Sequence, residues 1–284
     1  MKVAATGASG FIGHHVVNQL EKRGISPTLV GRPGSSTSKE FARHQVVEMD
    51  IADPPADAYD RLGRPDVLMH LAWGGLPNYS SKHHLEQELP AQRSFLEGLL
   101  SAGLRGLAIA GTCFEYGLQP GGLREDMPTA PVTAYGKAKD ELRTALERLR
   151  QIRPFNLTWA RLFYLHGEGQ AAGSLLPQLE TAIARGDATF NMSGGEQLRD
   201  YLSVDDAARY LVVLALNGRD NGVVNVCSGR RISVRELVEE VVRKHGSSIQ
   251  LNFGHFPYPE HEPMAFWGDR SKLTRLLEST NEAI

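Results

Sequence analysis

The 284-residue sequence has few cysteines, no excess of charge of one sign and no long apolar run. Its two cysteines, Cys113 and Cys227, are too few for a disulfide framework, so we expect reduced thiols and a cytoplasmic protein. A formal net charge of -2 provides no basic surface for nucleic acid or an anionic membrane. Strand-like sequence begins at Lys2, which leaves no room for a signal peptide, and no run reaches the ~18 apolar residues of a membrane span. We expect neither nucleic acid nor a membrane as a partner.

The sequence also offers no set of metal ligands at the spacing that a metal site requires. The adjacent pair His83 and His84 would point in different directions on a helix, and no further ligand follows at i+4. We interpret the pair as a solvated helix start and predict no metal.

A glycine-rich loop is the first positive signal. A short buried-strand pattern over residues 2–6 runs directly into the loop, and an amphipathic helix then extends to about Lys22. Glycine lets the backbone approach a pyrophosphate, and the free N–H groups of a helix N-terminus favour negative charge. The alternative is a turn with a close contact between helix and strand. We predict dinucleotide binding by Gly7, Ser9, Gly10, Phe11, Ile12 and Gly13.

The residue after the second strand bears on the choice of cofactor. An acidic residue there would accept from the ribose 2′-OH of NAD, whereas an arginine suits the 2′-phosphate of NADP. Arg32 occupies this neighbourhood, so the sequence favours NADPH, with NAD possible and a solvated loop arginine as the alternative. Asp50, which closes the third strand, would orient the adenine amine or cap a helix.

Five buried-strand patterns alternate with helical segments, which implies right-handed crossovers and a parallel sheet. We predict an α/β fold in which a Rossmann-type doubly wound parallel sheet is joined to a smaller mixed α/β substrate lobe near the C-terminus. The expected dinucleotide-binding domain is 1–165 plus 204–229, and the expected substrate lobe is 166–203 plus 230–284.

Three residues form the predicted chemical centre. Tyr135 and Lys139 are four positions apart in a segment of good helix formers, so they share one helix face. The neighbouring ammonium should bring the tyrosine pKa down from its usual value near ~10. Thr112, at the end of the fifth strand, can donate a hydrogen bond to a carbonyl or alcohol oxygen. The set indicates interconversion of a carbonyl and an alcohol beside a nicotinamide.

With these motifs in this order, the chain resembles the extended short-chain dehydrogenase/reductase family of nucleotide-sugar epimerases, dehydratases and ketoreductases. The resemblance implies that Tyr135 is the general acid, that Lys139 binds the nicotinamide ribose and that Thr112 holds the keto oxygen. It also implies cofactor contacts from residues that follow the third and fourth strands. The matching positions are Gly7, Gly10 and Gly13, Asp50 and Ile51, His70, Leu71, Ala72 and Trp73, Thr112, Tyr135, Lys139, Arg161 and Arg199.

Departures from the family pattern narrow the expected reaction. Where the 4,6-dehydratases carry Asp and Glu, this chain has Cys113 and Phe114, and Phe114 cannot exchange a proton. Longer strings around Trp73, Thr112 and Arg199 look like those of dTDP-4-dehydro-6-deoxyglucose reductases, which make dTDP-fucose. The resemblance therefore implies an NADPH-dependent 4-ketoreductase. An NAD-dependent nucleotide-sugar 4-epimerase or dehydrogenase, and a dinucleotide sensor without turnover, are the alternatives.

The resemblance also implies a sugar-nucleotide substrate and a homodimer formed through helices around 81–100 and 135–150. Arg199 would contact the substrate diphosphate, or else would form an ion pair with Asp200 or Asp205. Trp73 and Phe114 would form the wall of the pocket. The expected substrate-binding residues are Trp73, Thr112, Cys113, Phe114, Ser174 and Arg199.

Overall fold

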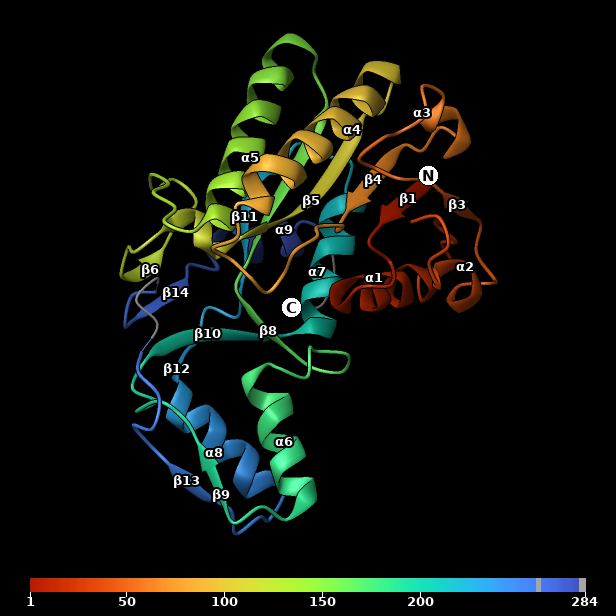
Figure 1. Ribbon diagram of the computed structural model, residues 1–284. Helices are drawn as coiled ribbons and strands as arrows, with labels where there is room; N and C mark the ends of the chain where they lie inside the picture. The colour runs from red at the N-terminus through yellow and green to blue at the C-terminus, as the bar shows by residue number, and fades with distance from the viewer. Residues whose placement is uncertain (259–261, 281–284) are drawn as a thin grey trace.

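A computed structural model describes residues 1–258 and 262–280 of the chain (Figure 1). Its centre is a seven-stranded sheet in the order β11-β7-β5-β4-β1-β2-β3, in which every neighbouring pair is parallel. The predicted doubly wound α/β fold is confirmed. The strands are β1 (Val3–Thr6), β2 (Thr28–Gly31), β3 (Val46–Glu48), β4 (Val67–His70), β5 (Gly106–Thr112), β7 (Asn156–Leu162) and β11 (Gly222–Val226).

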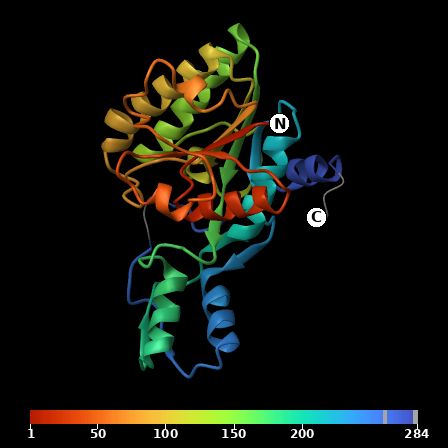
Figure 2. The same cartoon turned by 90° about the vertical axis from the view of Figure 1, so that its right-hand side faces the viewer.

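Helices cover both faces of this sheet, because its strands carry buried apolar residues on both sides. In β1 the side chains of Val3 and Ala5 join the core under α1 and α7, while Ala4 joins the core under α4 and α5. Figures 1 and 2 show these two pairs of helices on opposite faces of the sheet. The helices are α1 (Phe11–Glu21), α4 (Leu89–Ala102), α5 (Ala134–Ile152) and α7 (Val204–Leu216).

A smaller unit extends from the sheet beyond the carboxyl end of β7 (Figure 2). Its helices α6 and α8 pack around a separate core that includes Leu179, Met192, Val234 and Val238. The elements are β8 (Tyr164–His166), α6 (Leu175–Arg185), β9 (Thr189–Asn191), β10 (Leu198–Ser203), β12 (Arg231–Ser233), α8 (Val234–Lys244) and β13 (Gln250–Asn252).

The described end of the chain returns to the main sheet. The strand β14 (Phe266–Gly268) pairs with β6 (Gly121–Leu123), and α9 (Ser271–Glu278) packs on α7 and β11. Leu273 and Leu277 of α9 are fully buried in the core beneath the sheet. Helix α9 thus packs on the sheet, although it lies within the range 230–284 predicted for the lobe; the limits of the two domains stay a prediction.

Short helical turns lie in several of the segments that connect the strands of the sheet. Most relevant here is η1, a π-helical turn that precedes α4 where the sequence predicted one uninterrupted helix. In the described part of the chain, no helix is long and apolar enough to cross a membrane. The short elements are α2 (Thr37–Glu40), α3 (Ala58–Arg61), η1 (His84–Glu88) and the 3₁₀ turn η2 (Cys113–Tyr116).

Candidate active site

The glycine loop packs so closely on its neighbours that two of its glycines, Gly7 and Gly13, leave no space for a side chain. A Cβ on Gly7, whose φ is +73°, would lie 2.7 Å from the amide nitrogen of Ala72. A Cβ on Gly13, in the first turn of α1, would lie 2.0 Å from the carbonyl oxygen of Gly7. The loop thus brings bare main chain to the N-terminus of α1, a cradle of the kind that a dinucleotide pyrophosphate requires.

A buried polar network fixes the segment after β4 against this loop. The Thr6 hydroxyl accepts from the amides of Leu71 and Ala72, each at 3.2 Å, and lies 2.9 Å from Nδ1 of His70. The other ring nitrogen of His70 is 2.6 Å from Oε1 of Gln92. Burial lowers the pKa of His70 to about 3, so the ring is neutral and this bonding fixes its tautomer. Thr6 thereby holds Leu71 and Ala72 at the predicted cofactor edge.

The residues predicted for the adenosine end of the cofactor lie at the carboxyl ends of β2 and β3. Arg32 directly follows β2 and is exposed. The Thr37 hydroxyl donates to Ser9 of the glycine loop at 3.5 Å. Asp50 accepts from the amide of Ala52 at 2.9 Å, so one of its oxygens stabilises its own turn. Ile51 packs on the core beside it.

The three predicted catalytic residues meet at the carboxyl end of β5. Thr112 is the N-cap of η2, where its hydroxyl accepts from the amide of Phe114 at 3.3 Å. Tyr135 and Lys139 lie one turn apart on α5, which begins after the cap Thr133. The Lys139 ammonium donates to the carbonyl of Ala110 at 2.9 Å, so this lysine is anchored to the same strand that carries Thr112.

Burial governs the protonation of this set. It raises the pKa of Tyr135, with nearby Tyr79, Glu115 and Cys113 acting in the same direction and a hydrogen bond with Thr112 opposing them. The expectation that Lys139 lowers the tyrosine pKa is wrong for this structure, because desolvation of the phenolate dominates. Burial also lowers the pKa of Lys139 to about 7, although the charges of Glu115 and Glu88 oppose this change.

A ring of aromatic side chains encloses Tyr135, and the sequence interpretation missed one member of it. His84 is fully buried rather than solvated, and its ring centroid is 5.3 Å from that of Tyr135. Its Nδ1 accepts from the indole of Trp73 at 3.1 Å, and its Nε2 lies 2.8 Å from the carbonyl of Asn78. The Trp73 ring in turn lies 3.9 Å from the Lys139 ammonium. Tyr79, whose ring centroid is 5.6 Å from that of Tyr135, completes this set of surrounding side chains.

Glu115 is a second buried residue that the sequence interpretation missed. Its carboxylate accepts from the amide of Thr112 at 2.9 Å, from the indole of Trp159 at 2.9 Å and from Nε of Arg161 at 2.7 Å. Arg143 also approaches this carboxylate at 3.8 Å. Glu115 therefore fixes the backbone of Thr112 and neutralises a buried arginine. The Thr-x-x-Glu spacing of a capping box is the sequence signal that could have identified it.

On the substrate side, a cavity of about 360 Å³ is lined by residues of the smaller unit, including Tyr164 of β8 and Arg199 of β10, and by Glu262. The Arg199 guanidinium forms an ion pair with Glu262, in which Nη2 lies 2.8 Å from Oε2. The alternative partners Asp200 and Asp205 are both occupied elsewhere. Asp200 accepts from Ser228, Gly229 and Gly268, and Asp205 pairs with His15.

The remaining predicted substrate residues differ in their surroundings. Ser174 occupies the N-cap position of α6 without a side-chain capping hydrogen bond, and its neighbours Gly173 and Leu175 line the cavity. Phe114 is half-buried, with its ring centroid 4.9 Å from that of Tyr79. Cys113 is buried in an apolar cluster, and burial raises the pKa of its thiol, so it stays protonated. Within the described residues, no cluster of three or more His, Cys, Asp and Glu side chains could hold a metal.

The order of these parts along the chain agrees with a comparison of the whole sequence with known families. Residues 3–227 match the NAD dependent epimerase/dehydratase family. The chain belongs to this family. The match covers both the glycine loop and the Thr112, Tyr135 and Lys139 set, so members of this family provide the relevant comparison for the site.

Two similar family members are dTDP-6-deoxy-L-talose 4-dehydrogenases. The NAD(+) enzyme of Aggregatibacter actinomycetemcomitans is 28% identical over 94% of this chain and 99% of its own length. The NAD(P)(+) enzyme of Kitasatospora kifunensis is 28% identical over 88% of this chain and 81% of its own length. A UDP-glucose 4-epimerase of Azospirillum brasilense is 27% identical over 89% of this chain and 80% of its own length.

Solved structures of the family share the fold. The UDP-N-acetylglucosamine 4-epimerase of Methanobrevibacter ruminantium M1 aligns with a TM-score of 0.85 at 21% identity, covering 97% of this chain and 91% of that one. MoeE5, solved with UDP-glucuronic acid and NAD, aligns with a TM-score of 0.79 at 26% identity, covering 98% and 93%.

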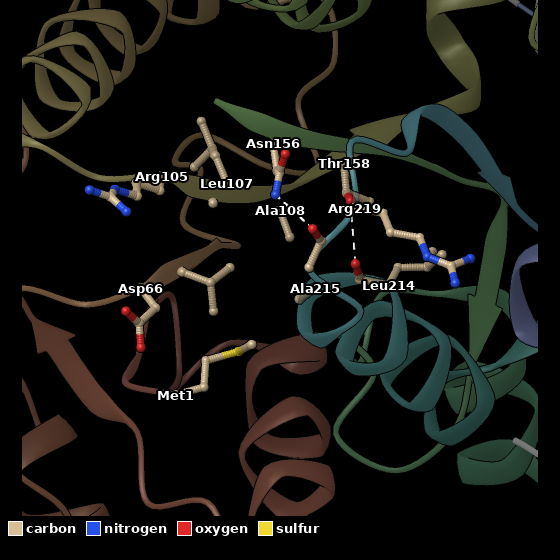
Figure 3. Close-up of a pocket in the computed structure, with 13 residues that line it drawn as sticks. Met1, Asp66, Arg105, Leu107, Ala108, Asn156, Thr158, Leu214, Ala215 and Arg219 are labelled. Atoms are coloured by element: carbon tan, nitrogen blue, oxygen red, sulfur yellow. Dashed lines mark hydrogen bonds between the residues drawn. The ribbon is translucent and has the colours of Figure 1, made fainter. Parts of the chain in front are cut away.

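Another cavity, of about 280 Å³, lies at the amino ends of the strands β5 and β7, opposite the carboxyl ends that carry the candidate active site (Figure 3). It is lined by Gly106 at the start of β5, whereas Thr112 ends the same strand. Asn156 and Thr158 beside it donate to the carbonyls of Gly218 and Leu214. This cavity is therefore separate from the candidate active site.

Proposed function

We propose that the protein is an NADPH-dependent reductase of the C4 keto group of a nucleotide-activated 4-keto-6-deoxyhexose, of the dTDP-4-dehydro-6-deoxyglucose type. The observation that carries this proposal is the meeting of Thr112, Tyr135 and Lys139 beside the glycine loop and next to the cavity that contains Arg199. A complete proton-transfer set of this kind argues against a dinucleotide sensor without turnover.

When bound, a nicotinamide dinucleotide supplies the hydride. The chain itself supplies the proton and the orientation of the substrate. The Thr112 oxygen accepts from the amide of Phe114, and the Thr112 hydroxyl also bonds with Tyr135, so both hydroxyls would point at one keto oxygen and Thr112 would donate to it. Because burial raises the pKa of Tyr135, the phenol stays protonated at neutral pH and can act as the general acid. Lys139, held by Ala110 and Trp73, would contact the nicotinamide ribose.

The preference for NADPH rests on the end of β2. Arg32 stands there without a carboxylate beside it in sequence, and the nearby side chains of Ser9, Ser35 and Thr37 are hydroxyls. Such a surface suits a 2′-phosphate better than a ribose diol. One dehydrogenase relative is named for NAD(+) and the other for NAD(P)(+), so the family itself contains both cofactors.

The relatives support chemistry at C4 of a 6-deoxyhexose. Their names describe dehydrogenation at C4 of dTDP-6-deoxy-L-talose, and reduction of a C4 ketone is the same class of reaction run backwards. Dehydration is not proposed, because Phe114 has no exchangeable proton and Cys113 stays protonated. A 4-epimerase is the second candidate, favoured by the epimerases among the similar sequences and structures.

The two candidates differ in what they consume. We would incubate the purified protein with NADPH or NADH and a panel of freshly prepared 4-keto-6-deoxy sugar nucleotides, following absorbance and then product stereochemistry by NMR. A reductase oxidises stoichiometric NADPH and gives one C4 epimer of the alcohol. Interconversion of UDP-glucose and UDP-galactose without net NADPH oxidation would instead establish the epimerase.

A further inference from the structure

The proposed substrate cavity, which residues of the lobe and Glu262 line, is close to electrically neutral. Among the described residues that line it, Arg199 carries the positive charge and Glu262 the negative charge. The Arg199 side chain is buried, with an exposed fraction of 3%, and the Glu262 side chain is partly buried, with an exposed fraction of 12%. A nucleotide diphosphate entering this cavity would therefore meet an arginine that already has a carboxylate partner.

The guanidinium of Arg199 is held by main-chain carbonyls on one side and pairs with Glu262 on the other. Its Nη1 donates to the carbonyls of Leu198 at 2.9 Å and Met264 at 3.3 Å, and its face lies 4.6 Å from the ring centroid of Phe266. These contacts do not involve Glu262, so they would keep Arg199 in place if the carboxylate moved away. The opposite edge, formed by Nε and Nη2, is the edge that binds planar anions in a bidentate manner.

Glu262 uses this edge incompletely. Both Nε, at 3.3 Å, and Nη2, at 2.8 Å, donate to the same carboxylate oxygen, Oε2. The pair therefore lacks the two parallel hydrogen bonds of the strongest arginine–carboxylate geometry, which a phosphate can form with both donors. The Glu262 carboxylate thus occupies the two Arg199 donors that would bind an anionic ligand, but it binds them less strongly than a bidentate anion would.

The charge of Glu262 also reaches the catalytic side of the cavity. Burial raises the pKa of Tyr79, which contacts Tyr135, and that of Tyr164, whose ring lies 5.8 Å from the Arg199 guanidinium, and the charge of Glu262 adds to both increases. A ligand anion beside Arg199 would lie close to this carboxylate and would be repelled by it.

We propose that Glu262 is an internal competitor for the anionic end of the substrate: Arg199 exchanges the Glu262 carboxylate for the substrate diphosphate. This inference rests on the proposed sugar-nucleotide substrate, and it assigns Glu262 a role in setting substrate affinity rather than in the chemical step.

The test compares diphosphate binding by the wild-type chain and Glu262→Gln, which keeps the shape of the side chain and removes its charge. We would titrate dTDP and UDP by calorimetry in the presence of saturating NADP⁺. The dissociation constant of Glu262→Gln should be lower by about tenfold or more, the effect of removing one like charge beside a bound anion. Glu196→Gln, at an exposed carboxylate of the same lobe, serves as the matched control and should bind like the wild type.

The double variant Arg199→Met/Glu262→Gln should lose the gain, because the exchange takes place on the guanidinium. Thermal unfolding of each variant distinguishes weaker folding from weaker binding. Equal or weaker binding of both diphosphates by a folded Glu262→Gln would overturn the inference while leaving the proposed function intact. Failure of both proteins to bind either diphosphate would overturn the inference and the proposed function together.

Discussion

The buried ammonium of Lys139 should destabilise the fold in a pH-dependent way, and Lys139→Met should reveal it. Lys139 is 2% exposed, and burial lowers its pKa from 10.5 to about 7. This difference corresponds to about 5 kcal/mol, at about 1.4 kcal/mol for each tenfold change in proton affinity. Glu115 and Glu88 already oppose the shift, so this figure is the net cost of keeping the lysine charged inside the protein.

The sign follows from which state holds the proton. Between the folded pKa of about 7 and the unfolded value of 10.5, the unfolded chain carries a proton on Lys139 that the folded chain lacks. Unfolding therefore takes up a proton, and the stability of the wild type rises with pH across this window. Below the folded pKa the full cost is present, and above the unfolded pKa it has vanished. The methionine variant has no such dependence.

The assay is urea unfolding of both proteins at several pH values. Relative to Lys139→Met, the wild type should gain about 3 kcal/mol in unfolding free energy between about pH 7 and about pH 9.5. Lys137→Met, at an exposed position on the same helix, controls for the loss of a lysine from α5. Parallel pH curves for wild type and Lys139→Met would refute the reasoning, because they would show that the ammonium is not desolvated.

Three further predictions follow from the same contacts. Glu115→Gln should cost about 3–5 kcal/mol in unfolding free energy, because it leaves the buried Arg161 without its carboxylate; urea unfolding against the exposed control Glu141→Gln measures this, and a loss below ~1 kcal/mol would contradict it. Arg32→Ala should weaken NADPH binding about tenfold or more, the scale of a charge-assisted hydrogen bond, with little effect on NADH; equal losses for both cofactors would show that Arg32 does not contact the 2′-phosphate. If the Lys139 ammonium holds the cofactor, kcat/KM for NADPH should fall as pH rises through about 7, and a flat profile would exclude that role.

Much of the fold followed from local patterns. The buried strands, the glycine loop and the alternation with helices predicted the doubly wound sheet, since each signal lies within a few neighbouring residues. The i and i+4 spacing of Tyr135 and Lys139 predicted that both side chains lie on one helix face, and in α5 they lie one turn apart, because a helix fixes that relation without tertiary information.

Other features depend on contacts that no local pattern encodes. His84 resembled a solvated residue because its partners, the Trp73 indole and the Asn78 carbonyl, reach it through a folded loop. The partner of Arg199 lies 63 positions away in sequence. The direction of the Tyr135 pKa shift depended on burial, which outweighs the nearby ammonium. The homodimer, the limits of the two domains and the roles assigned to individual site residues stay predictions.

The central claim is that Tyr135 donates the proton when a C4 ketone is reduced. The most direct test is Tyr135→Phe, with turnover measured on the best substrate of the panel and NADPH binding measured by fluorescence. Phenylalanine fills the same buried space but cannot donate a proton. We predict that turnover falls by ~100-fold or more, the scale of a lost general acid, while the dissociation constant of NADPH changes little. Near-normal turnover by Tyr135→Phe would contradict the account.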